Sequence, residues 1–195
     1  MPDDLPEKIR AFIAIELPES ILQTIQEAQE TLKGYGFGIR WVRRQGMHLT
    51  LKFLGNIRRG DLEQLRGAIE QASLEFLPFS LKGKGIGVFP DIRRPRVVWV
   101  GVLGDVEALC AFQRRLESQL KVLGFPKERR PFKGHLTLGR VKDRVDRTKL
   151  GEALEELKGF QTEPFTAGSV VLFESDLRPS GAIYSKLAEA PFRSA

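Results

Sequence analysis

Hydrophobic residues along the 195-residue chain alternate between a spacing typical of strands and a spacing typical of helices. The first apolar run, residues 9–17, is rich in β-branched and aromatic residues and predicts a strand. Pro18 then opens a segment with apolar positions at helical spacing that ends at Gly34. The pattern continues with a strand through His48 to Phe53, a helix with apolar positions between Leu62 and Ala72, and a strand at residues 79–89.

The same order begins again after a polar, basic segment at residues 90–96. Residues 97–103 predict a strand, and Asp105 is placed to cap a helix that stops at Gly124. The remaining predicted elements are a strand with His135 to Leu138, a helix with apolar positions between Leu150 and Leu157, and strands at residues 165–173 and 182–188.

This duplication predicts one domain built from two lobe-forming repeats, at about 9–89 and 97–174. The segment 90–96 is expected to connect the lobes, and the final strand, at about 182–188, has no counterpart in the first repeat. Hydrophobic residues make up 42% and charged residues 29% of the chain, which is typical of a globular protein with a sizeable core.

Each repeat carries the sequence His-Leu-Thr-Leu in its second strand, beginning at His48 and at His135. Because side chains alternate along a strand, His48 and Thr50 share one face, and so do His135 and Thr137. The imidazole and the hydroxyl of each motif then stand roughly 7 Å apart, close enough to contact one phosphate group. An ordinary half-buried strand would explain one copy, but two copies at matching places that use both histidines of the chain favour a shared catalytic site.

Two opposed imidazoles suit acid–base displacement at phosphorus, because at neutral pH one can be a neutral base and the other a protonated acid. The hydroxyls of Thr50 and Thr137 are placed to donate to the non-bridging oxygens. Metal catalysis is the competing use of histidine, but neither motif has an acidic residue at ligand spacing. We therefore predict no metal and no other cofactor.

Arg140 follows the second motif and is a candidate to bind phosphate through its guanidinium. In an unbroken strand its side chain would point away from His135, so this role requires a bend, which Gly139 permits. A solvated arginine at the end of the strand is the alternative. Basic residues also cluster near both motifs and predict a positive rim suited to an oligonucleotide backbone, in a chain of net charge +6; they are Arg40, Arg43, Arg44, Lys52, Arg93, Arg94, Arg96, Arg129, Arg130, Lys133 and Lys142.

Three aromatic residues are candidates for stacking a base. Trp41 and Trp99 are more typical of core or boundary positions, and core packing is also favoured for Phe12 unless its strand turns that ring toward the cleft. Cys110 is the only cysteine, no segment resembles a signal peptide, and no run approaches the roughly 20 apolar residues that cross a bilayer. A cytoplasmic protein without a membrane partner is expected.

The paired motifs resemble the His-x-Thr-x signature of the two-histidine phosphoesterase superfamily. Within it, the chain resembles the bacterial and archaeal RNA 2′,3′-cyclic phosphodiesterases, historically called 2′-5′ RNA ligases. The resemblance rests on three stretches: R-A-F-I-A-I-E-L-P from Arg10, H-L-T-L-K-F-L-G from His48 and K-G-H-L-T-L-G-R from Lys133. It implies an α+β, duplicated bilobal fold, with two antiparallel sheets flanking a central cleft and helices on the outside.

The resemblance also implies metal-independent hydrolysis of an RNA 2′,3′-cyclic phosphate, or of a cyclic nucleotide, to a 2′-phosphate. By motif position, His48 protonates the departing O3′, His135 activates water, and Thr50, Thr137 and Arg140 hold the phosphate. Reversible 2′-5′ RNA ligation is a variant of the same chemistry. The alternative is a non-catalytic RNA-binding module that uses the same basic cleft. A monomer is expected.

Overall fold

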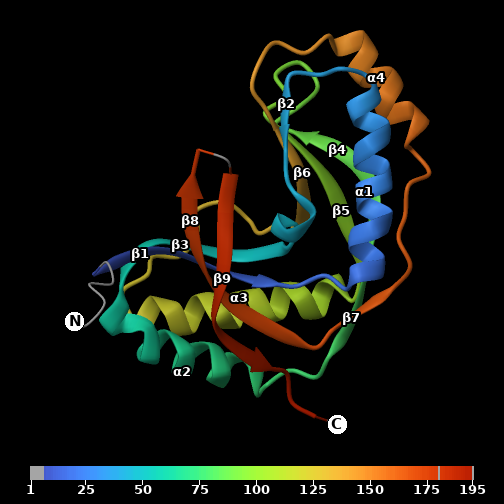
Figure 1. Ribbon diagram of the computed structural model, residues 1–195. Coiled ribbons are helices and arrows are strands. Elements are labelled where there is room, and N and C mark those ends of the chain that lie inside the picture. Colours follow the sequence, from blue (N-terminus) through green and yellow to red (C-terminus); the bar gives the residue numbers. More distant parts are fainter. Residues whose placement is uncertain (1–6, 180, 195) are drawn as a thin grey trace.

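The computed structural model describes residues 7–179 and 181–194, and within them the chain forms one antiparallel sheet with four α-helices (Figure 1). The strands are β1 (Lys8–Ile15), β2 (Ile39–Trp41), β3 (Leu49–Arg58), β4 (Phe79–Phe89), β5 (Val97–Gly104), β6 (His135–Val141), β7 (Phe165–Ala167), β8 (Ser169–Arg178) and β9 (Gly181–Pro191). The helices are α1 (Glu19–Gly34), α2 (Leu62–Ser73), α3 (Val106–Val122) and α4 (Arg147–Glu156), with short 3₁₀ turns η1 (Arg44–Gly46) and η2 (Arg59–Asp61).

The sheet consists of two halves with a narrow junction. Its strand order is β7-β4-β5-β6-β3-β1-β8-β9, and β2 pairs with the side of β6. Strands β6 and β3 are paired at one position, Leu49 opposite Leu136. The predicted α+β fold with antiparallel strands is confirmed, whereas the prediction of two separate sheets was wrong, because this pairing joins the halves into a single curled sheet.

The order of strands in the sheet does not follow the order of the two sequence repeats. Strand β4 closes the first repeat but pairs with β5, and β8 closes the second repeat but pairs with β1. The expected repeats at about 9–89 and 97–174 therefore exchange their last strands. The prediction that residues 90–96 connect two lobes was wrong, since this segment is the loop of the β4–β5 hairpin.

Most predicted elements are present, with three differences. The expected strand at residues 165–173 is two strands, because β7 pairs with β4 and the chain then crosses to the other half, where β8 pairs with β1. The short strand β2 was not predicted. Asp105 does precede α3, but its carboxylate accepts a hydrogen bond from the backbone N–H of Ser80 rather than from the helix.

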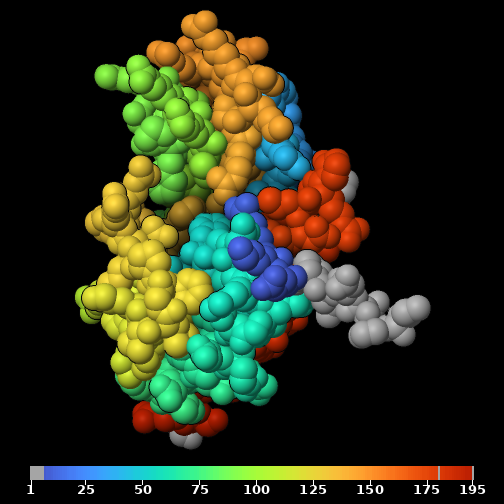
Figure 2. All heavy atoms as spheres, turned by 90° about the vertical axis from the view of Figure 1, so that its left-hand side faces the viewer, coloured from blue at the N-terminus to red at the C-terminus, as the bar shows by residue number. Residues whose placement is uncertain are grey.

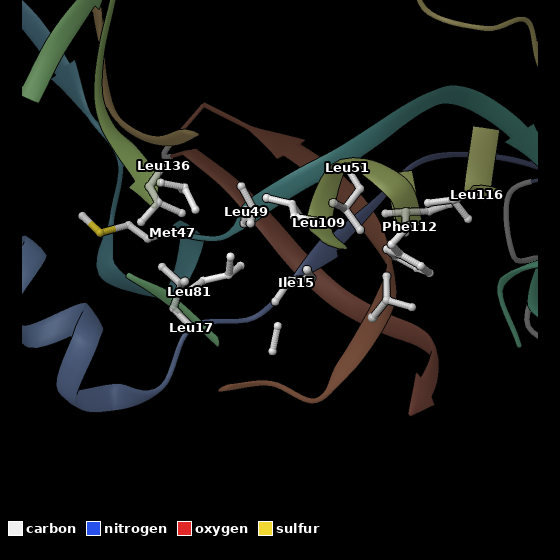
Figure 3. Packing of buried hydrophobic residues seen from close by; sticks show 14 of the residues in the cluster. Ile15, Leu17, Met47, Leu49, Leu51, Leu81, Leu109, Phe112, Leu116 and Leu136 are labelled. Carbon is white, nitrogen blue, oxygen red and sulfur yellow. The ribbon is translucent and has the colours of Figure 1, made fainter. Parts of the chain in front are cut away.

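The helices cover the side of the sheet away from the motif histidines. In Figure 1, α1 and α4 lie beside the half that contains β6, while α2 and α3 lie beside the half that contains β3. The leucines of both motifs are buried in one continuous core; they are Leu49, Leu51, Leu136 and Leu138. Figure 3 shows the first three of them among the packed residues. Within the described residues, none of the helices has the length and apolar character needed to cross a membrane.

Candidate active site

The two His-Leu-Thr-Leu motifs lie side by side at the junction of the two halves. Leu49 pairs with Leu136, and the two strands run in opposite directions from this pair. The histidine of each motif is therefore placed beside the threonine of the other. The four side chains that the structure brings together at one pocket are His48, Thr50, His135 and Thr137.

This pocket has a volume of about 560 Å³, which is in the range of small-molecule sites. Figure 2 shows the surface indented between an upper part, coloured green and orange, and a lower part, coloured yellow and cyan. Among the described residues that line the pocket there are five arginines and no carboxylate; the arginines are Arg10, Arg40, Arg43, Arg140 and Arg178. A site of this charge favours a ligand with at least one phosphate group.

Each motif contains a β-bulge at its fourth residue. The pairing skips Leu51 between Thr50 and Lys52, and it skips Leu138 between Thr137 and Gly139. An extra residue reverses the alternation of side chains beyond it. The bulge at Leu138 therefore turns the side chain of Arg140 to the same side of the sheet as that of His135, and both residues line the pocket.

Gly139 is needed where the second motif passes β2. A β-carbon at this residue would lie 2.5 Å from Cγ2 of Ile39 and 3.0 Å from Cε3 of Trp41. The absence of a side chain thus permits the close approach of β2 to β6, which brings Arg40 opposite Arg140.

A buried glutamine contacts the carbonyl oxygen of each bulged leucine. Nε2 of Gln29, on α1, donates to the carbonyl of Leu138 at 3.0 Å and to that of Val42 at 2.8 Å. Nε2 of Gln113, on α3, donates to the carbonyl of Leu51 at 3.5 Å. Both bulges are thus held from the helix side of the sheet.

His48 lies in an aromatic enclosure. Its ring stacks on Phe12 with centroids 4.6 Å apart, and Tyr184 meets it edge-on at 5.3 Å. Burial lowers the pKa of His48 to about 4, and a hydrogen bond with the backbone of Gly46 acts in the opposite direction. The neutral imidazole is therefore the form of His48 at neutral pH.

His135 has a different environment. Its Nδ1–H donates to the carbonyl of Lys133 at 2.7 Å, because a carbonyl oxygen can only accept. This hydrogen bond leaves Nε2 as the nitrogen that can exchange a proton with a ligand. Phe89 meets the ring edge-on, with centroids 5.1 Å apart.

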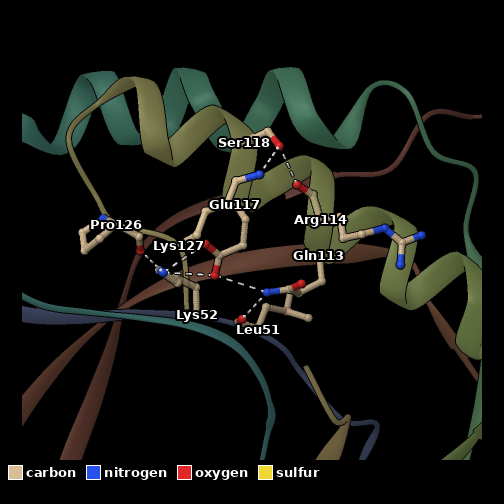
Figure 4. Close-up of polar contacts among 8 residues, drawn as sticks. All are labelled: Leu51, Lys52, Gln113, Arg114, Glu117, Ser118, Pro126 and Lys127. Atoms are coloured by element: carbon tan, nitrogen blue, oxygen red, sulfur yellow. Dashed lines mark hydrogen bonds and ion pairs between the residues drawn. The ribbon is translucent and has the colours of Figure 1, made fainter. Parts of the chain in front are cut away.

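Two of the basic residues predicted to form a rim do not belong to it. Lys52 is buried and its Nζ lies 3.0 Å from Oε1 of Glu117 and 2.6 Å from the carbonyl oxygen of Pro126 (Figure 4). The bulge at Leu51 turns this lysine toward α3. Arg44 forms an ion pair with Glu19 of α1, with 2.5 Å between Nη2 of the arginine and Oε1 of the glutamate. Of the remaining nine predicted rim residues, Arg40 and Arg43 line the pocket, and the other seven are not part of its described lining.

Several pocket residues were missed or placed differently by sequence reasoning. Phe12 is buried as expected, but on the pocket side, where it contacts His48. Trp41 lines the pocket while Trp99 is not part of its lining. The arginines and aromatic residues of the lining that were not singled out beforehand are Arg10, Phe53, Arg178 and Tyr184. Two of them come from the β8–β9 hairpin, and its unmatched last strand was the one signal that could have indicated them.

The described residues offer no group of three or more His, Cys, Asp or Glu side chains placed to hold a metal ion. The pocket itself contains two histidines without a neighbouring carboxylate or thiolate in its described lining. Metal-free chemistry stays a prediction.

Comparisons with known proteins identify the family of this chain. The family described as LigT like Phosphoesterase matches residues 15–99 and 103–184, and each stretch contains one motif. An RNA 2′,3′-cyclic phosphodiesterase of Methanothermobacter thermautotrophicus is 35% identical over 180 residues, which are 92% of this chain and 97% of that protein. The protein of the same name from Methanocaldococcus jannaschii is 36% identical over 181 residues, which are 93% and 99% of the two chains.

Solved structures share the fold. The structure of TT0787 from Thermus thermophilus has a TM-score of 0.79 and 25% identity, and the match covers 95% of this chain and 98% of that one. The structure of E. coli LigT complexed with 3′-AMP has a TM-score of 0.75 and 24% identity over 96% of this chain and 100% of that one. Fold, site and family match together define a phosphoesterase of the two-histidine class. The chain belongs to the LigT-like phosphoesterase family, as the resemblance of its motifs led us to expect.

Proposed function

We propose that the protein hydrolyses 2′,3′-cyclic phosphates at the ends of RNA to 2′-phosphates, without a metal ion. The observation that carries this proposal is the register that sets each motif histidine beside the threonine of the other motif, in a pocket lined by arginines. The name shared by the two methanogen relatives, which match nearly full length, supports the same activity.

In the proposed reaction a water oxygen attacks phosphorus and the bond between phosphorus and O3′ breaks. His135 takes the proton of the water at Nε2, since its Nδ1 is engaged with the carbonyl of Lys133. His48 gives a proton to the departing O3′, which leaves a 3′ hydroxyl and a 2′-phosphate. The groups that bind the non-bridging oxygens are Thr50, Thr137 and Arg140.

The role of His48 as the acid requires that it carries a proton when the substrate is bound. Burial favours its neutral form and lowers its pKa to about 4. A phosphate anion beside the imidazole favours the charged form, so phosphate binding and protonation of His48 are coupled. The bound anion is expected to raise the pKa of His48 toward the working pH.

The same site supports the reverse reaction, in which the 2′-5′ linkage between two RNA ends is formed. Water at high concentration favours hydrolysis, so we propose ligation as the minor activity. A cytoplasmic location and a monomeric state remain predictions from the sequence.

The decisive assay uses a short RNA that ends in a 2′,3′-cyclic phosphate, incubated with the protein and EDTA between pH 5 and 8. Mass spectrometry should show the addition of one water, and a phosphatase specific for 3′ ends should leave the product intact. No product at any pH would contradict the proposal, and tight RNA binding without turnover would favour the RNA-binding alternative. His135→Asn, purified in the same way, controls for contaminating nucleases.

A further inference from the structure

Most of the net positive charge of the chain lies in two short segments, residues 90–96 and 140–149. The first contains three arginines and one aspartate, a net charge of +2, and the second contains five basic and two acidic residues, a net charge of +3. Together the two segments account for +5 of the net charge of +6. All of their basic side chains are exposed; they are Arg93, Arg94, Arg96, Arg140, Lys142, Arg144, Arg147 and Lys149.

The fold brings the two segments together beside the pocket. The backbone N–H of Val141 donates to the carbonyl of Arg96 at 2.9 Å, and a β-carbon at Gly151 of α4 would lie 3.9 Å from Cδ1 of Ile92. Figure 1 shows the β4–β5 loop beside the segment that leads from β6 to α4. Because the second segment starts at Arg140, which lines the pocket, the charged surface begins at the pocket. We call residues 90–96 and 140–149 the hairpin–α4 surface.

The cations of the hairpin–α4 surface are not neutralised by neighbouring carboxylates. None of the eight basic side chains takes part in an ion pair of the described residues. The carboxylates of Asp91 and Asp146 accept hydrogen bonds from backbone N–H groups two and three residues further along the chain. Beyond the pocket, Arg144 and Arg147 line a second hollow of the surface. The positive charge is thus available to a ligand.

A polyanion fits this surface better than another protein does. Ile92 is the one exposed large hydrophobic residue of the two segments, so little apolar area is available for the core of a protein interface. Exposed cations of one sign bind a phosphate chain, because that chain releases its condensed counterions when it is neutralised. The proposed substrate supplies such a chain, since each nucleotide upstream of the cyclic phosphate adds one phosphodiester.

We propose that the hairpin–α4 surface binds the phosphodiester backbone of the RNA upstream of the cyclic phosphate. This inference rests on the proposed function, because it takes the cyclic phosphate to lie between the two motifs. Contacts to phosphates carry no sequence information, so the surface favours long RNA ends of any sequence. The protein therefore prefers the ends of RNA chains to cyclic mononucleotides.

The test compares adenosine 2′,3′-cyclic phosphate with an oligoadenylate of about ten nucleotides that ends in the same group, so that the substrates differ in the number of phosphates. The measured quantity is kcat/KM at a series of NaCl concentrations. We expect the unaltered protein to favour the oligoadenylate at low salt and to lose this preference as salt increases. A plot of log kcat/KM against log salt should be steeper for the oligoadenylate by about 2 to 3, since each phosphate contact of a single strand contributes about 0.7.

Two double variants remove charge from the surface outside the pocket lining: Arg93→Ser with Arg94→Ser, and Arg144→Ser with Arg147→Ser. Each should reduce the salt slope on the oligoadenylate by about 1.4, as expected for two lost phosphate contacts. The reaction of the mononucleotide, which does not reach these residues, should change much less. Arg114→Ser with Lys121→Ser removes the same charge from exposed positions of α3 and is the matched control.

The outcomes separate this surface from a general effect of charge. Salt slopes that stay unchanged in both surface variants, or that fall as much in the α3 control, would overturn the proposal. An equal loss on both substrates would overturn it as well, because that result indicates a structural role. If the unaltered protein cleaves neither substrate, the proposed function fails first. If it cleaves both with the same salt slope, only the RNA-binding surface fails.

Discussion

The imidazole of His48 stacks on the ring of Phe12, with centroids 4.6 Å apart and planes inclined by 25°. Phe173 lies behind this pair, with its centroid 6.2 Å from that of the imidazole. Aromatic rings replace water around the imidazole and offer no counter-charge. The pKa of His48 is lowered to about 4 for this reason.

The free energy of unfolding should fall as the pH decreases from 6.5 to about 4. In this interval the unfolded chain binds a proton at His48 and the folded chain does not, so acid favours unfolding. The loss approaches about 3 kcal/mol, since one pKa unit corresponds to about 1.4 kcal/mol. Urea unfolding at a series of pH values measures it. His48→Asn cannot titrate and should have a flatter profile, and an unchanged profile would contradict the lowered pKa.

His48→Ala and His135→Ala should each reduce kcat by about 10²–10⁴-fold while RNA binding and folding are largely retained. The double variant should lose little more than the worse single variant, because the two groups act as a pair. One fully active single variant would refute paired acid–base catalysis. The pH profile of kcat should be bell-shaped.

A substrate with sulfur in place of the bridging O3′ distinguishes the two roles. A thiolate leaves without a proton, so a general acid contributes little to its departure. His48→Ala should therefore recover most of its activity on the sulfur substrate, and His135→Ala should not. Recovery of the His135 variant instead would reverse the assignment of acid and base.

Much of this site could be predicted from the chain because strand alternation is a local rule. Alternation put His48 and Thr50 on one face and the motif leucines in the core, and the structure has them so. The same rule failed for Lys52, which is two residues after Thr50 in the strand and was expected on the same face, at the rim. The bulge at Leu51 and the partner Glu117, 65 residues away, depend on tertiary contacts that a local pattern does not contain.

The exchange of strands between repeats was hidden for a similar reason. The sequence repeat gives the order of elements along the chain but not which strands pair. Strand β4 pairs with β5, to which a short loop joins it, and β8 pairs with β1, which is far away in the sequence. A short polar segment such as residues 90–96 is compatible with the loop of a hairpin as well as with a linker, and we interpreted it as a linker. The β8–β9 hairpin, which adds Arg178 and Tyr184 to the pocket, has no repeat to indicate it.

The buried ion pair between Lys52 and Glu117 should be sensitive to the loss of either partner. Both side chains are almost inaccessible to water, so Lys52→Met leaves a carboxylate buried without its cation and should destabilise the fold by about 3–5 kcal/mol. The double variant with Glu117→Leu should recover most of this loss. Lys158→Met, at the exposed pair with Glu155, is the control and should change stability by less than about 1 kcal/mol.

Urea unfolding of these variants decides whether the pair acts as a unit. Equal losses in the single variants that simply add in the double variant would contradict mutual compensation. Because Lys52 also binds the carbonyl of Pro126, the single variant should loosen the chain after α3, which hydrogen exchange at Phe125 and Lys127 can detect.

Gln29 should act as a positioning residue for Arg140 although it lies on the helix side of the sheet. Its amide donates to the carbonyl of the bulged residue Leu138, two positions before the arginine. Gln29→Leu removes this donor and should cost about 1–3 kcal/mol of stability, because buried carbonyls lose a partner. It should also reduce kcat by about ten- to a hundredfold, since a displacement near 1 Å can have that effect. Gln71→Leu, at an exposed position of α2, is the matched control and should change neither quantity.

A double-mutant cycle separates positioning of Arg140 from a general loss of stability. If Gln29 acts through the guanidinium, Arg140→Met should reduce kcat/KM much less when Gln29→Leu is already present. In that variant the arginine is already displaced, so its removal loses little more. Strictly additive losses in the free energy of activation would mean that the glutamine stabilises the fold without directing the arginine. Measurement at a temperature well below the unfolding transition of the least stable variant ensures that all four proteins are compared in the folded state.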